Sequence, residues 1–351
     1  MKIGFILLIF SYCWAYADCK GRGYIDVSTT QSKQKSRPAS IGIIGDTSDI
    51  ATPTTGGTVL MGGGNDVNQA FQWMIRKSGG GDVVVIRAAG TDAYNPYINA
   101  LGKVNSVETL KIDSRELADN DTVISIIKNA ELLFIAGGDQ SNYMKYWKGT
   151  KTADAINYLM NEKKVPVGGT SAGCAILCGY YFSGEKGSIT STEALADPYN
   201  AAVTLYKQDF LHPPFLENVI TDQHYLTRNR EGRHIAFISR IKKDWNGKLT
   251  GIAVDEKTAL CIDNNGYATV FGSSYAFIIK PNNGNIEVCE KNQRLTWING
   301  EKALAVYQIK GKDSGAGEIK LAAKSMKDKK SEGKWLYWWV DQGIFKASHE
   351  N

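Results

Sequence analysis

The sequence predicts an α/β fold in which most strands of the central sheet are parallel. Short apolar runs rich in β-branched residues recur between residues 41 and 167, and most of them end in glycine-rich turns. Segments with apolar residues near i, i+3, i+4 and i+7, as in amphipathic helices, lie between these runs. Continuous apolar runs are typical of strands buried on both faces, and their alternation with helices indicates a parallel sheet with crossover helices.

The expected elements follow one another along the chain. Strands are predicted at 41–44, 58–61, 83–86, 107–112, 132–135, 164–167, 219–220, 251–256, 303–309 and 335–340. Helices are predicted at 67–76, 123–127, 153–160 and 172–180. Because sites in such sheets form at the carboxyl ends of the strands, the glycine clusters at these ends are candidates for functional loops.

Four segments are expected in the chain. Residues 1–17 have the pattern of a secretory signal, because Lys2 comes before an apolar run and Ala15-Tyr16-Ala17 fits a cleavage site. The alternative for this run is a buried N-terminal strand. The signal predicts secretion, either extracellular or, in a bacterium, periplasmic. Residues 18–39 are then an N-terminal arm, residues 40–274 are the α/β domain with the candidate site, and residues 275–351 are a β-rich extension. The aromatic residues of the extension favour core packing over a carbohydrate platform: Trp335, Tyr337, Trp338 and Trp339.

Composition excludes several classes of function. The formal net charge of +5 is too small for a nucleic-acid binder, and no aromatic residues interleave the basic run near residue 230. After the signal, no stretch approaches the ~18 apolar residues of a membrane span. No Cys/His spacing resembles a zinc site, so no metal is expected. Asn120-Asp121-Thr122 is a glycosylation sequon, which has meaning only in a eukaryotic source.

Five cysteines remain after removal of the signal, and an odd number leaves at least one thiol free or bonded to another chain. Cys174 and Cys178 are four residues apart on a predicted helix, so they share a face and favour core packing. A disulfide among Cys19, Cys261 and Cys289 stays open, because pairing cannot be derived from sequence.

Gly169-Thr170-Ser171-Ala172-Gly173 is the central motif. It matches G-x-S-x-G and lies between a predicted strand and a predicted helix, the context of a nucleophile elbow. Glycines at 169 and 173 permit a sharp turn, and the N-terminus of the helix favours negative charge near Ser171. The N–H of Ala172 is a candidate donor to an oxyanion. The alternative is a phosphate-binding or purely structural glycine turn.

A nucleophilic serine needs a base, and the sequence has four histidines. His224 directly follows the apolar end of a predicted strand, on the same edge as the elbow, and is the best candidate; a structural histidine is the alternative. His234 is predicted to face solvent. Asp255 and Glu256 end another predicted strand, and either can orient the imidazole.

Three arginines, Arg228, Arg230 and Arg233, follow His224 closely. Arginine guanidinium groups bind carboxylates through paired hydrogen bonds, so the cluster indicates an acidic substrate group. The alternative is a solvated basic helix start with internal ion pairs.

Four motifs together resemble the cyanophycinase and aspartyl-dipeptidase (dipeptidase E-like) family of serine peptidases. Residues 137–140 are similar to its G-G-D-Q motif, and residues 169–173 to its elbow. Residues 222–233 (DQHYLTRNREGR) resemble its D-Q-H motif with three arginines, and residues 252–259 (IAVDEKTA) resemble its strand ending in D-E-x-T-A. The motifs occur in the family's order and span about residues 40–275.

The resemblance implies a flavodoxin-like three-layer sandwich, similar to class I glutamine amidotransferases and often a homodimer. It implies hydrolysis of amide bonds next to aspartate, in cyanophycin-like polymers or Asp-containing peptides, without metal or cofactor. Rival hypotheses are a G-x-S-x-G esterase and a non-catalytic binding protein on the same scaffold. By position, the resemblance implies Ser171 as nucleophile, His224 as base, Glu256 as its partner, Gly63 and Ala172 as oxyanion donors, and Gln140, Asp222, Gln223, Arg228, Arg230 and Arg233 as pocket residues.

The sequence departs from the family pattern in two places. Residues 61–65 (MGGGN) keep an early glycine cluster but lack the acidic residue that often follows it, and the β-rich tail is additional.

Overall fold

The computed structural model describes residues 37–321 and 327–349. The predicted signal, most of the predicted arm and Cys19 lie outside these residues, so secretion stays a prediction. The described residues form a ten-stranded and an eight-stranded sheet.

The ten-stranded sheet has parallel strands at its centre. The pairs β3–β4, β3–β5, β5–β6 and β6–β2 are parallel, whereas β1 and β11 pair antiparallel at the two sides of this block. In spatial order its strands are β1 (Ser40–Gly45), β4 (Ser106–Lys111), β3 (Asp82–Arg87), β5 (Leu132–Ile135), β6 (Pro166–Thr170), β2 (Gly57–Met61), β11 (Thr258–Asp263), β12 (Tyr267–Gly272), β15 (Ala316–Lys320) and β16 (Lys327–Asp328).

The eight-stranded sheet contains the rest of the described strands. Only β9 pairs parallel, with β10 and β7, and the other pairs are antiparallel. In spatial order its strands are β18 (Ile344–His349), β17 (Lys334–Asp341), β14 (Leu304–Lys310), β13 (Tyr275–Pro281), β10 (Thr250–Val254), β9 (Val219–Gln223), β7 (Tyr180–Phe182) and β8 (Leu205–Lys207).

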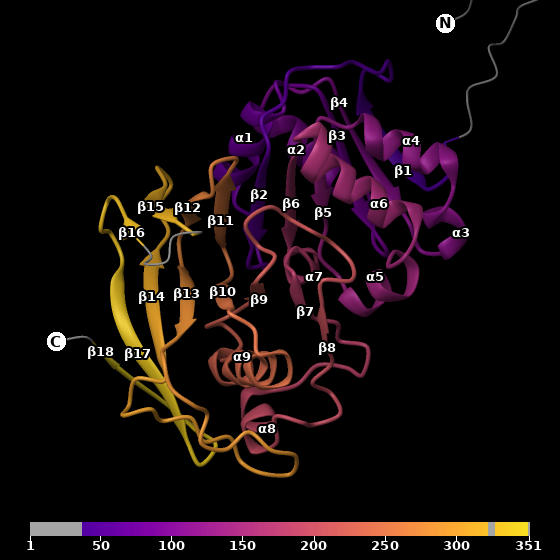
Figure 1. Cartoon of the computed structure of the whole chain (residues 1–351). Coiled ribbons are helices and arrows are strands. Elements are labelled where there is room, and N and C mark those ends of the chain that lie inside the picture. Colours follow the sequence, from indigo (N-terminus) through magenta and orange to yellow (C-terminus); the bar gives the residue numbers. More distant parts are fainter. Residues whose placement is uncertain (1–36, 322–326, 350–351) are drawn as a thin grey trace, which may run out of the picture. The chain divides into compact units, whose positions relative to one another are not determined.

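The helices cover both sheets (Figure 1). Helices α1 and α2 share a hydrophobic core with one face of the parallel strands, and α4 to α7 share a core with the other face. Helices α8 and α9 pack with the eight-stranded sheet. The helices are α1 (Asn68–Lys77), α2 (Tyr94–Leu101), α3 (Arg115–Ala118), α4 (Asp121–Asn129), α5 (Gln140–Tyr146), α6 (Lys151–Tyr158), α7 (Ala172–Ile176), α8 (Ser191–Ala196) and α9 (Glu231–Trp245), and a π-helical turn, η1 (Leu159–Lys163), extends α6.

The parallel strands are buried on both faces, as their continuous apolar runs predict. In β2, Val59 and Met61 lie in the core shared with α1, whereas Leu60 lies in the core on the opposite face. The α/β class, the parallel central strands and the three-layer arrangement are confirmed. When β3 to β6 are counted in chain order, their spatial order β4-β3-β5-β6 is the flavodoxin-like order 2-1-3-4. The fifth position is taken by β2, which precedes these four strands in the chain.

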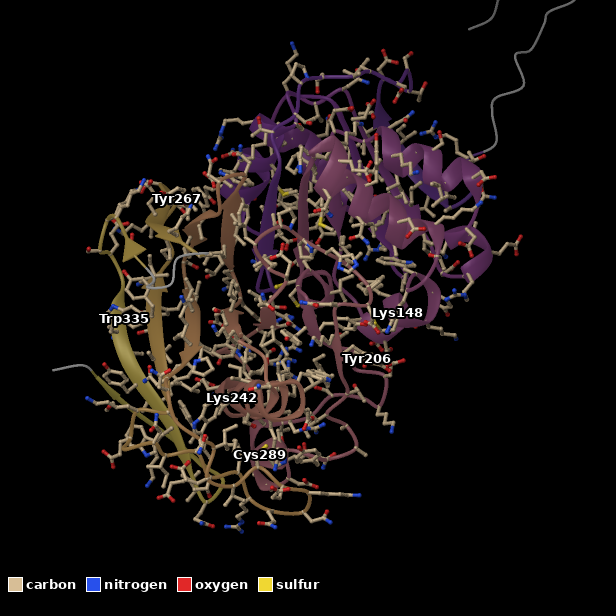
Figure 2. The ribbon with its side chains drawn as sticks, in the orientation of Figure 1. Lys148, Tyr206, Lys242, Tyr267, Cys289 and Trp335 are labelled. Atoms are coloured by element: carbon tan, nitrogen blue, oxygen red, sulfur yellow. The ribbon has the colours of Figure 1, made fainter. Side chains whose placement is uncertain are left out.

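Strands after residue 275 extend both sheets. β13, β14, β17 and β18 continue the eight-stranded sheet, and β15 and β16 end the ten-stranded sheet. The predicted packing role of the aromatics is confirmed for Trp338 and Trp339, which are buried, while the half-buried Trp335 contacts Tyr307 at a ring distance of 5.1 Å (Figure 2). The domain boundary at 274/275 stays a prediction.

The predicted helix at 172–180 is too long. Helix α7 ends at Ile176, and residues 180–182 (YYF) form β7, because aromatic residues suit a strand packed on both sides. At the turn, Gly179 approaches the carbonyl oxygen of Glu217 so closely that an added Cβ would lie 1.9 Å from it. Cys178 is therefore not on α7, and Cys174, Cys178, Cys261 and Cys289 are buried free thiols.

The turn from β6 into α7 depends on close backbone contacts. A Cβ added at Gly169 would lie 2.5 Å from the carbonyl carbon of Gly173, and one added at Gly173 would lie 2.2 Å from the carbonyl oxygen of Ile135. Between these glycines, Ser171 has φ 52° and ψ −113°, a combination that a non-glycine residue adopts only under strain.

We expect Gly173→Ala to lower the free energy of unfolding by about 1–3 kcal/mol, although alanine is normally favoured within a helix, because the clash is with backbone. Urea denaturation measures the loss. The control is Gly232→Ala in α9, where the added Cβ meets Leu195 Cδ1 at 2.7 Å and Ser191 Cβ at 2.9 Å, side-chain atoms of the short helix α8 and not backbone. A loss at Gly173 no larger than at Gly232 would contradict the tight packing of the turn.

Candidate active site

Ser171, His224 and Glu256 form one chain of hydrogen bonds. Ser171 Oγ lies 2.7 Å from His224 Nε2, and His224 Nδ1 lies 2.6 Å from Glu256 Oε1. With Nδ1–H donating to the carboxylate, Nε2 is unprotonated and can accept the serine proton. The arrangement can thus activate the Ser171 hydroxyl as a nucleophile.

The serine and the histidine come from different sheets. Ser171 follows β6 of the ten-stranded sheet, whereas His224 follows β9 and Glu256 follows β10, both in the eight-stranded sheet. The prediction that His224 shares a sheet edge with the elbow is therefore wrong. The two sheets meet here because α7 contacts both β6 and β9.

Asp255 and Glu256 were the two candidates for the carboxylate that orients His224, and the contacts of Asp255 decide between them. This carboxylate accepts hydrogen bonds from the N–H and hydroxyl of Thr227, each at 3.0 Å, and from the hydroxyl of Ser274 at 2.7 Å. Burial would raise the pKa of Asp255, but these hydrogen bonds outweigh it and hold the pKa below its usual value. Asp255 thus anchors the loop after His224, and of the two carboxylates it is Glu256 that makes a hydrogen bond with the imidazole.

A glycine loop brings the three residues together. Ser171 N–H donates to the Met61 carbonyl at 3.1 Å, and His224 N–H donates to the Gly62 carbonyl at 2.8 Å. A Cβ at Gly63 would lie 2.3 Å from His224 Cε1, and one at Gly64 would lie 2.8 Å from Glu256 Oε2. Glycine is therefore required where the loop touches the imidazole and the carboxylate.

The two predicted oxyanion donors lie beside this chain of hydrogen bonds. Gly63 packs against the imidazole, and Ala172 is the first residue of α7, where backbone N–H groups have no partner within the helix. Donors in these places can stabilise negative charge on an acyl oxygen next to Ser171.

Burial and two arginines tune His224. Burial lowers the pKa of the imidazole, the hydrogen bond to Glu256 opposes this, and the charges of Arg228 and Arg230 lower the pKa further. The histidine therefore stays neutral at neutral pH, as a general base requires.

A pocket of about 220 Å³ opens beside Ser171 and His224. It brings together the predicted residues Gln140, Gln223, Arg228, Arg230 and Arg233. The side chain of Arg228 is exposed and has no hydrogen-bond or ion-pair partner in the described part of the chain. Arg230 is more enclosed: it donates to the Gln223 carbonyl at 2.8 Å, and burial lowers its pKa to about 10.

Arg233 and Asp222 form a buried ion pair. Arg233 Nε and Nη2 donate to the two oxygens of Asp222 at 2.8 and 2.5 Å, and both side chains are at most 2% exposed. Burial would raise the pKa of Asp222, but the guanidinium outweighs it and the pKa is lowered. Arg233 borders the pocket, but Asp222 takes two of its donors. Arg230 makes a longer ion pair, with Nη1 3.6 Å from Asp222 Oδ1, so Arg228 and the remaining donors of Arg230 are available to a ligand.

The prediction that His234 faces solvent is wrong. His234 is fully buried in α9, with Nδ1 3.3 Å from the Tyr225 hydroxyl and Nε2 3.3 Å from the Ile220 carbonyl oxygen. Burial lowers its pKa to about 4, so it is a neutral structural residue. The neighbouring Arg233 suggested an exposed face, but that arginine is itself buried by its pairing with Asp222.

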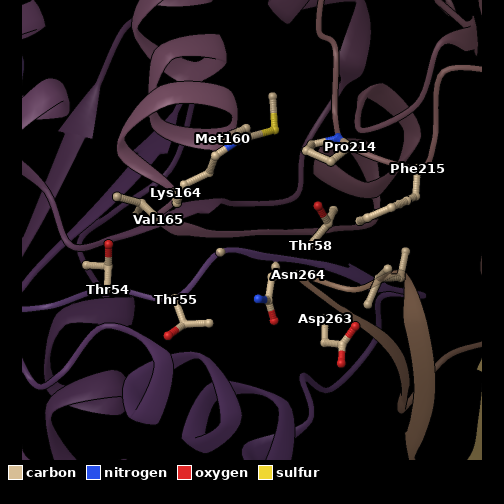
Figure 3. Close-up of a pocket in the computed structure, with 13 residues that line it drawn as sticks. Thr54, Thr55, Thr58, Met160, Lys164, Val165, Pro214, Phe215, Asp263 and Asn264 are labelled. Atoms are coloured by element: carbon tan, nitrogen blue, oxygen red, sulfur yellow. The ribbon is translucent and has the colours of Figure 1, made fainter.

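A second, larger pocket of about 460 Å³ lies where β2 and β6 begin, opposite the end that carries Ser171 (Figure 3). Its wall combines threonines and apolar residues and includes no serine, histidine or cysteine: Thr54, Thr55, Gly56, Gly57, Thr58, Met160, Lys164, Val165, Pro214, Phe215, Ile262, Asp263 and Asn264. It therefore lacks the groups of a serine peptidase site.

The described residues 37–321 and 327–349 contain no group of three or more His, Cys, Asp or Glu side chains that could hold a metal ion. None of their helices has the length and apolar character needed to cross a bilayer.

The sequence profile of peptidase family S51 matches residues 54–270. The chain belongs to peptidase family S51. The match covers every residue of the site, from the glycine loop to Glu256, which confirms the resemblance derived from the four motifs.

Individual relatives of this S51 chain are distant. It is 26% identical to cyanophycinases of Trichormus variabilis and Nostoc sp. over 175 residues, which are 50% of this chain and 53% of each relative. The chain thus spans about half the length of these relatives. A cyanophycinase of Synechococcus elongatus is 26% identical over 234 residues, 64% of this chain and 67% of that protein.

Two solved structures are similar to this chain at 17% sequence identity. A peptidase from an acI-B1 Actinobacterium aligns with a TM-score of 0.48 over 64% of this chain and 91% of its own. A putative peptidase E protein from Listeria monocytogenes aligns with a TM-score of 0.42 over 63% of this chain and 100% of its own.

Asp66 is the residue near the site that sequence reasoning missed. The prediction that residues 61–65 lack a following acidic residue is wrong, because Asp66 directly follows Asn65, and its carboxylate accepts a hydrogen bond from the Tyr94 hydroxyl at 2.5 Å. The signal that could have found it is an acidic residue directly after a glycine-rich turn.

We expect Arg233→Gln to lower the free energy of unfolding by about 3–5 kcal/mol, because it leaves the buried Asp222 carboxylate with only the longer ion pair to Arg230, at 3.6 Å. Arg228→Gln should change it by no more than about 0.5 kcal/mol, because that side chain is exposed. Urea denaturation of both variants measures the difference. Similar effects of the two substitutions would contradict the structural role of the Asp222–Arg233 pair.

Proposed function

We propose that this protein is a serine peptidase that hydrolyses amide bonds next to aspartate through an acyl-enzyme on Ser171. The observation that carries the proposal is the continuous hydrogen bonding from Ser171 Oγ through His224 to Glu256. Membership of peptidase family S51 and the similarity to cyanophycinases support the same reaction class.

In the proposed mechanism, His224 Nε2 removes the Ser171 proton while Oγ attacks the scissile carbonyl carbon. The carbonyl π electrons move to oxygen, and the N–H groups of Gly63 and Ala172 stabilise the resulting oxyanion. The tetrahedral intermediate collapses, the C–N bond breaks, and His224 gives its proton to the leaving amine. Water, deprotonated by His224, then attacks the acyl-enzyme and releases the acid and the serine.

The charges around the pocket support an acidic substrate. Arg228 and Arg230 supply two guanidinium groups, and the Oε1 atom of Gln223 is buried without a hydrogen-bond partner among the described residues. An aspartyl residue that is linked through its β-carboxyl group and whose α-carboxyl group is free, as at the carboxyl end of a chain, carries an α-carboxylate and an α-nitrogen on one carbon. The carboxylate matches the arginines, and the N–H matches the unpaired acceptor. We therefore propose β-aspartyl peptides or a cyanophycin-like polymer as the substrate class.

We expect wild-type protein to release products from β-Asp-Xaa peptides faster than from α-Asp-Xaa or Ala-Xaa peptides, as measured by mass spectrometry. Ser171→Ala should lower kcat by on the order of 10⁶-fold, because the nucleophile is lost. The control is Ser125→Ala, at an exposed position in α4.

A fluorophosphonate probe should label wild-type protein and not Ser171→Ala. Hydrolysis retained by Ser171→Ala would overturn the mechanism. Absence of both labelling and hydrolysis in folded wild-type protein would favour a binding protein on a peptidase scaffold.

The pH dependence should report the charges around His224. Activity requires the neutral imidazole, so kcat/KM should fall as pH drops through a pKa below the usual histidine value of about 6.5. Arg228→Gln removes a positive charge, which raises the pKa of His224 and moves this acidic limb to higher pH. Lys103→Gln, at an exposed site before the start of β4, is the control for charge alone. An acidic limb unmoved in Arg228→Gln would show that this charge does not act on His224.

A further inference from the structure

The loop from β2 to α1 carries both a predicted oxyanion donor and a carboxyl group. Gly63 packs against His224, and Asp66 follows three residues later. Asp66 does not cap α1, because Val67 occupies the N-cap position and no side chain accepts a hydrogen bond there. The carboxyl group of Asp66 is therefore held by other contacts.

One of these contacts is with α2. The Tyr94 hydroxyl donates to Asp66 Oδ2 at 2.5 Å, and the Tyr94 ring packs against Phe134 of β5 and Phe71 of α1, with centroid distances of 5.2 and 6.2 Å. Tyr94 is thus a rigid support for one side of the carboxyl group.

The other oxygen of the carboxyl group, Oδ1, is one of two unpaired polar atoms in this part of the described structure. Asp66 Oδ1 and Thr170 Oγ1 are both buried, and neither has a hydrogen-bond partner within the described ranges. Thr170 is 4% exposed and directly precedes Ser171. Each unpaired buried polar atom costs about 1–3 kcal/mol, so a hydrogen bond between these two atoms would stabilise the elbow.

The Thr170 hydroxyl influences the Asp66 carboxyl, although no hydrogen bond joins the two unpaired atoms. Burial raises the pKa of the Asp66 carboxyl, and the hydroxyls of Tyr94 and Thr170 oppose this. The carboxyl is also faced by Tyr97 of α2, whose pKa is raised to about 12 by burial and by the charge of Asp66. Arg87 of β3 lies over the Tyr94 ring at 6.0 Å and is the nearby cation. A small rotation of either side chain would let the Thr170 hydroxyl donate to Asp66 Oδ1, which pairs both atoms.

We propose that Asp66 is a positioning residue, whose carboxyl group joins Tyr94 to Thr170 and thereby holds the Gly63 N–H at a fixed place relative to Ser171. This inference rests on the proposed function, because it assigns Gly63 to the oxyanion. Asp66 touches neither substrate nor the reacting atoms; it acts through the backbone of the loop and of the elbow.

Removing the carboxyl group should affect the transition state more than substrate binding. Misplacing an oxyanion donor weakens an interaction made only in the transition state, so kcat falls while KM stays nearly constant. We expect Asp66→Ala to lower kcat about 10- to 100-fold with KM within about twofold. Asp66→Asn should retain kcat within about threefold, because the amide can accept from Tyr94 and donate to Thr170 while carrying no charge.

The experiment compares steady-state kinetics of wild-type protein, Asp66→Ala, Asp66→Asn, Thr170→Val and the double variant Asp66→Ala/Thr170→Val on the best β-Asp peptide. Asp154→Ala, at an exposed site on α6, is the control for loss of an aspartate. Because the residues are proposed to act as one unit, the double variant should lose no more activity than Asp66→Ala alone.

Three outcomes would overturn the proposal: full kcat in Asp66→Ala, an equal loss in Asp66→Asn and Asp66→Ala, or additive losses in the double variant. If Asp66→Ala does not fold, as urea denaturation would reveal, Thr170→Val and Asp66→Asn still decide the question. Failure of the proposed function is distinguishable, because it would remove hydrolysis from the wild-type protein and leave Ser171 unlabelled by the fluorophosphonate probe.

Discussion

The site depends on one glycine loop whose backbone accepts hydrogen bonds from the segments of all three candidate residues. The carbonyls of Met61, Gly62 and Gly63 accept from the N–H groups of Ser171, His224 and Lys257 at 3.1, 2.8 and 3.1 Å. These bonds fix the start of α7, the end of β9 and the turn after β10 against one strand end. Side chains at Gly63 and Gly64 would occupy the space of the His224 imidazole and the Glu256 carboxylate. The geometry of the site therefore requires glycine at these two positions.

Around this loop, the two sheets supply different parts of the chemistry. The ten-stranded sheet provides the strained elbow and the candidate oxyanion donors, and the eight-stranded sheet provides the base, its carboxylate partner and the arginines. The buried Asp222–Arg233 pair ties the end of β9 to α9, which leaves Arg228 and Arg230 to lower the pKa of His224 and to face the pocket. The buried charges of Asp222 and Arg233 thus hold the end of β9 against α9, and the charges of Arg228 and Arg230 keep His224 neutral.

Much of this arrangement could be predicted from the sequence, because its signals are local. Glycines at strand ends, continuous apolar runs and the turn around Ser171 reflect short-range constraints, and the structure has the predicted elements there. Features that depend on contacts between segments far apart in the sequence could not be predicted in the same way. The aromatic residues of β7 suit either a helix or a strand until their partners are known, and a strand end does not reveal which sheet it joins. Burial of Arg233 and His234 follows from Asp222 on another element, so a solvated helix start was an equally good interpretation of the sequence.

The order of the strands also affects when the molecule can become complete during synthesis. β2 is made early, at residues 57–61, but it is hydrogen-bonded to β6, more than a hundred residues later, and to β11, which ends at Asp263. Domains begin to fold on the ribosome as their residues emerge, and contacts between distant segments form slowly. The glycine loop that follows β2 therefore receives its last neighbours only when about three quarters of the chain exists. A nascent chain that ends before residue 256 carries Ser171 without the carboxylate partner of the base, and one that ends before residue 224 lacks the histidine as well. The order of translation itself therefore delays the appearance of a reactive serine.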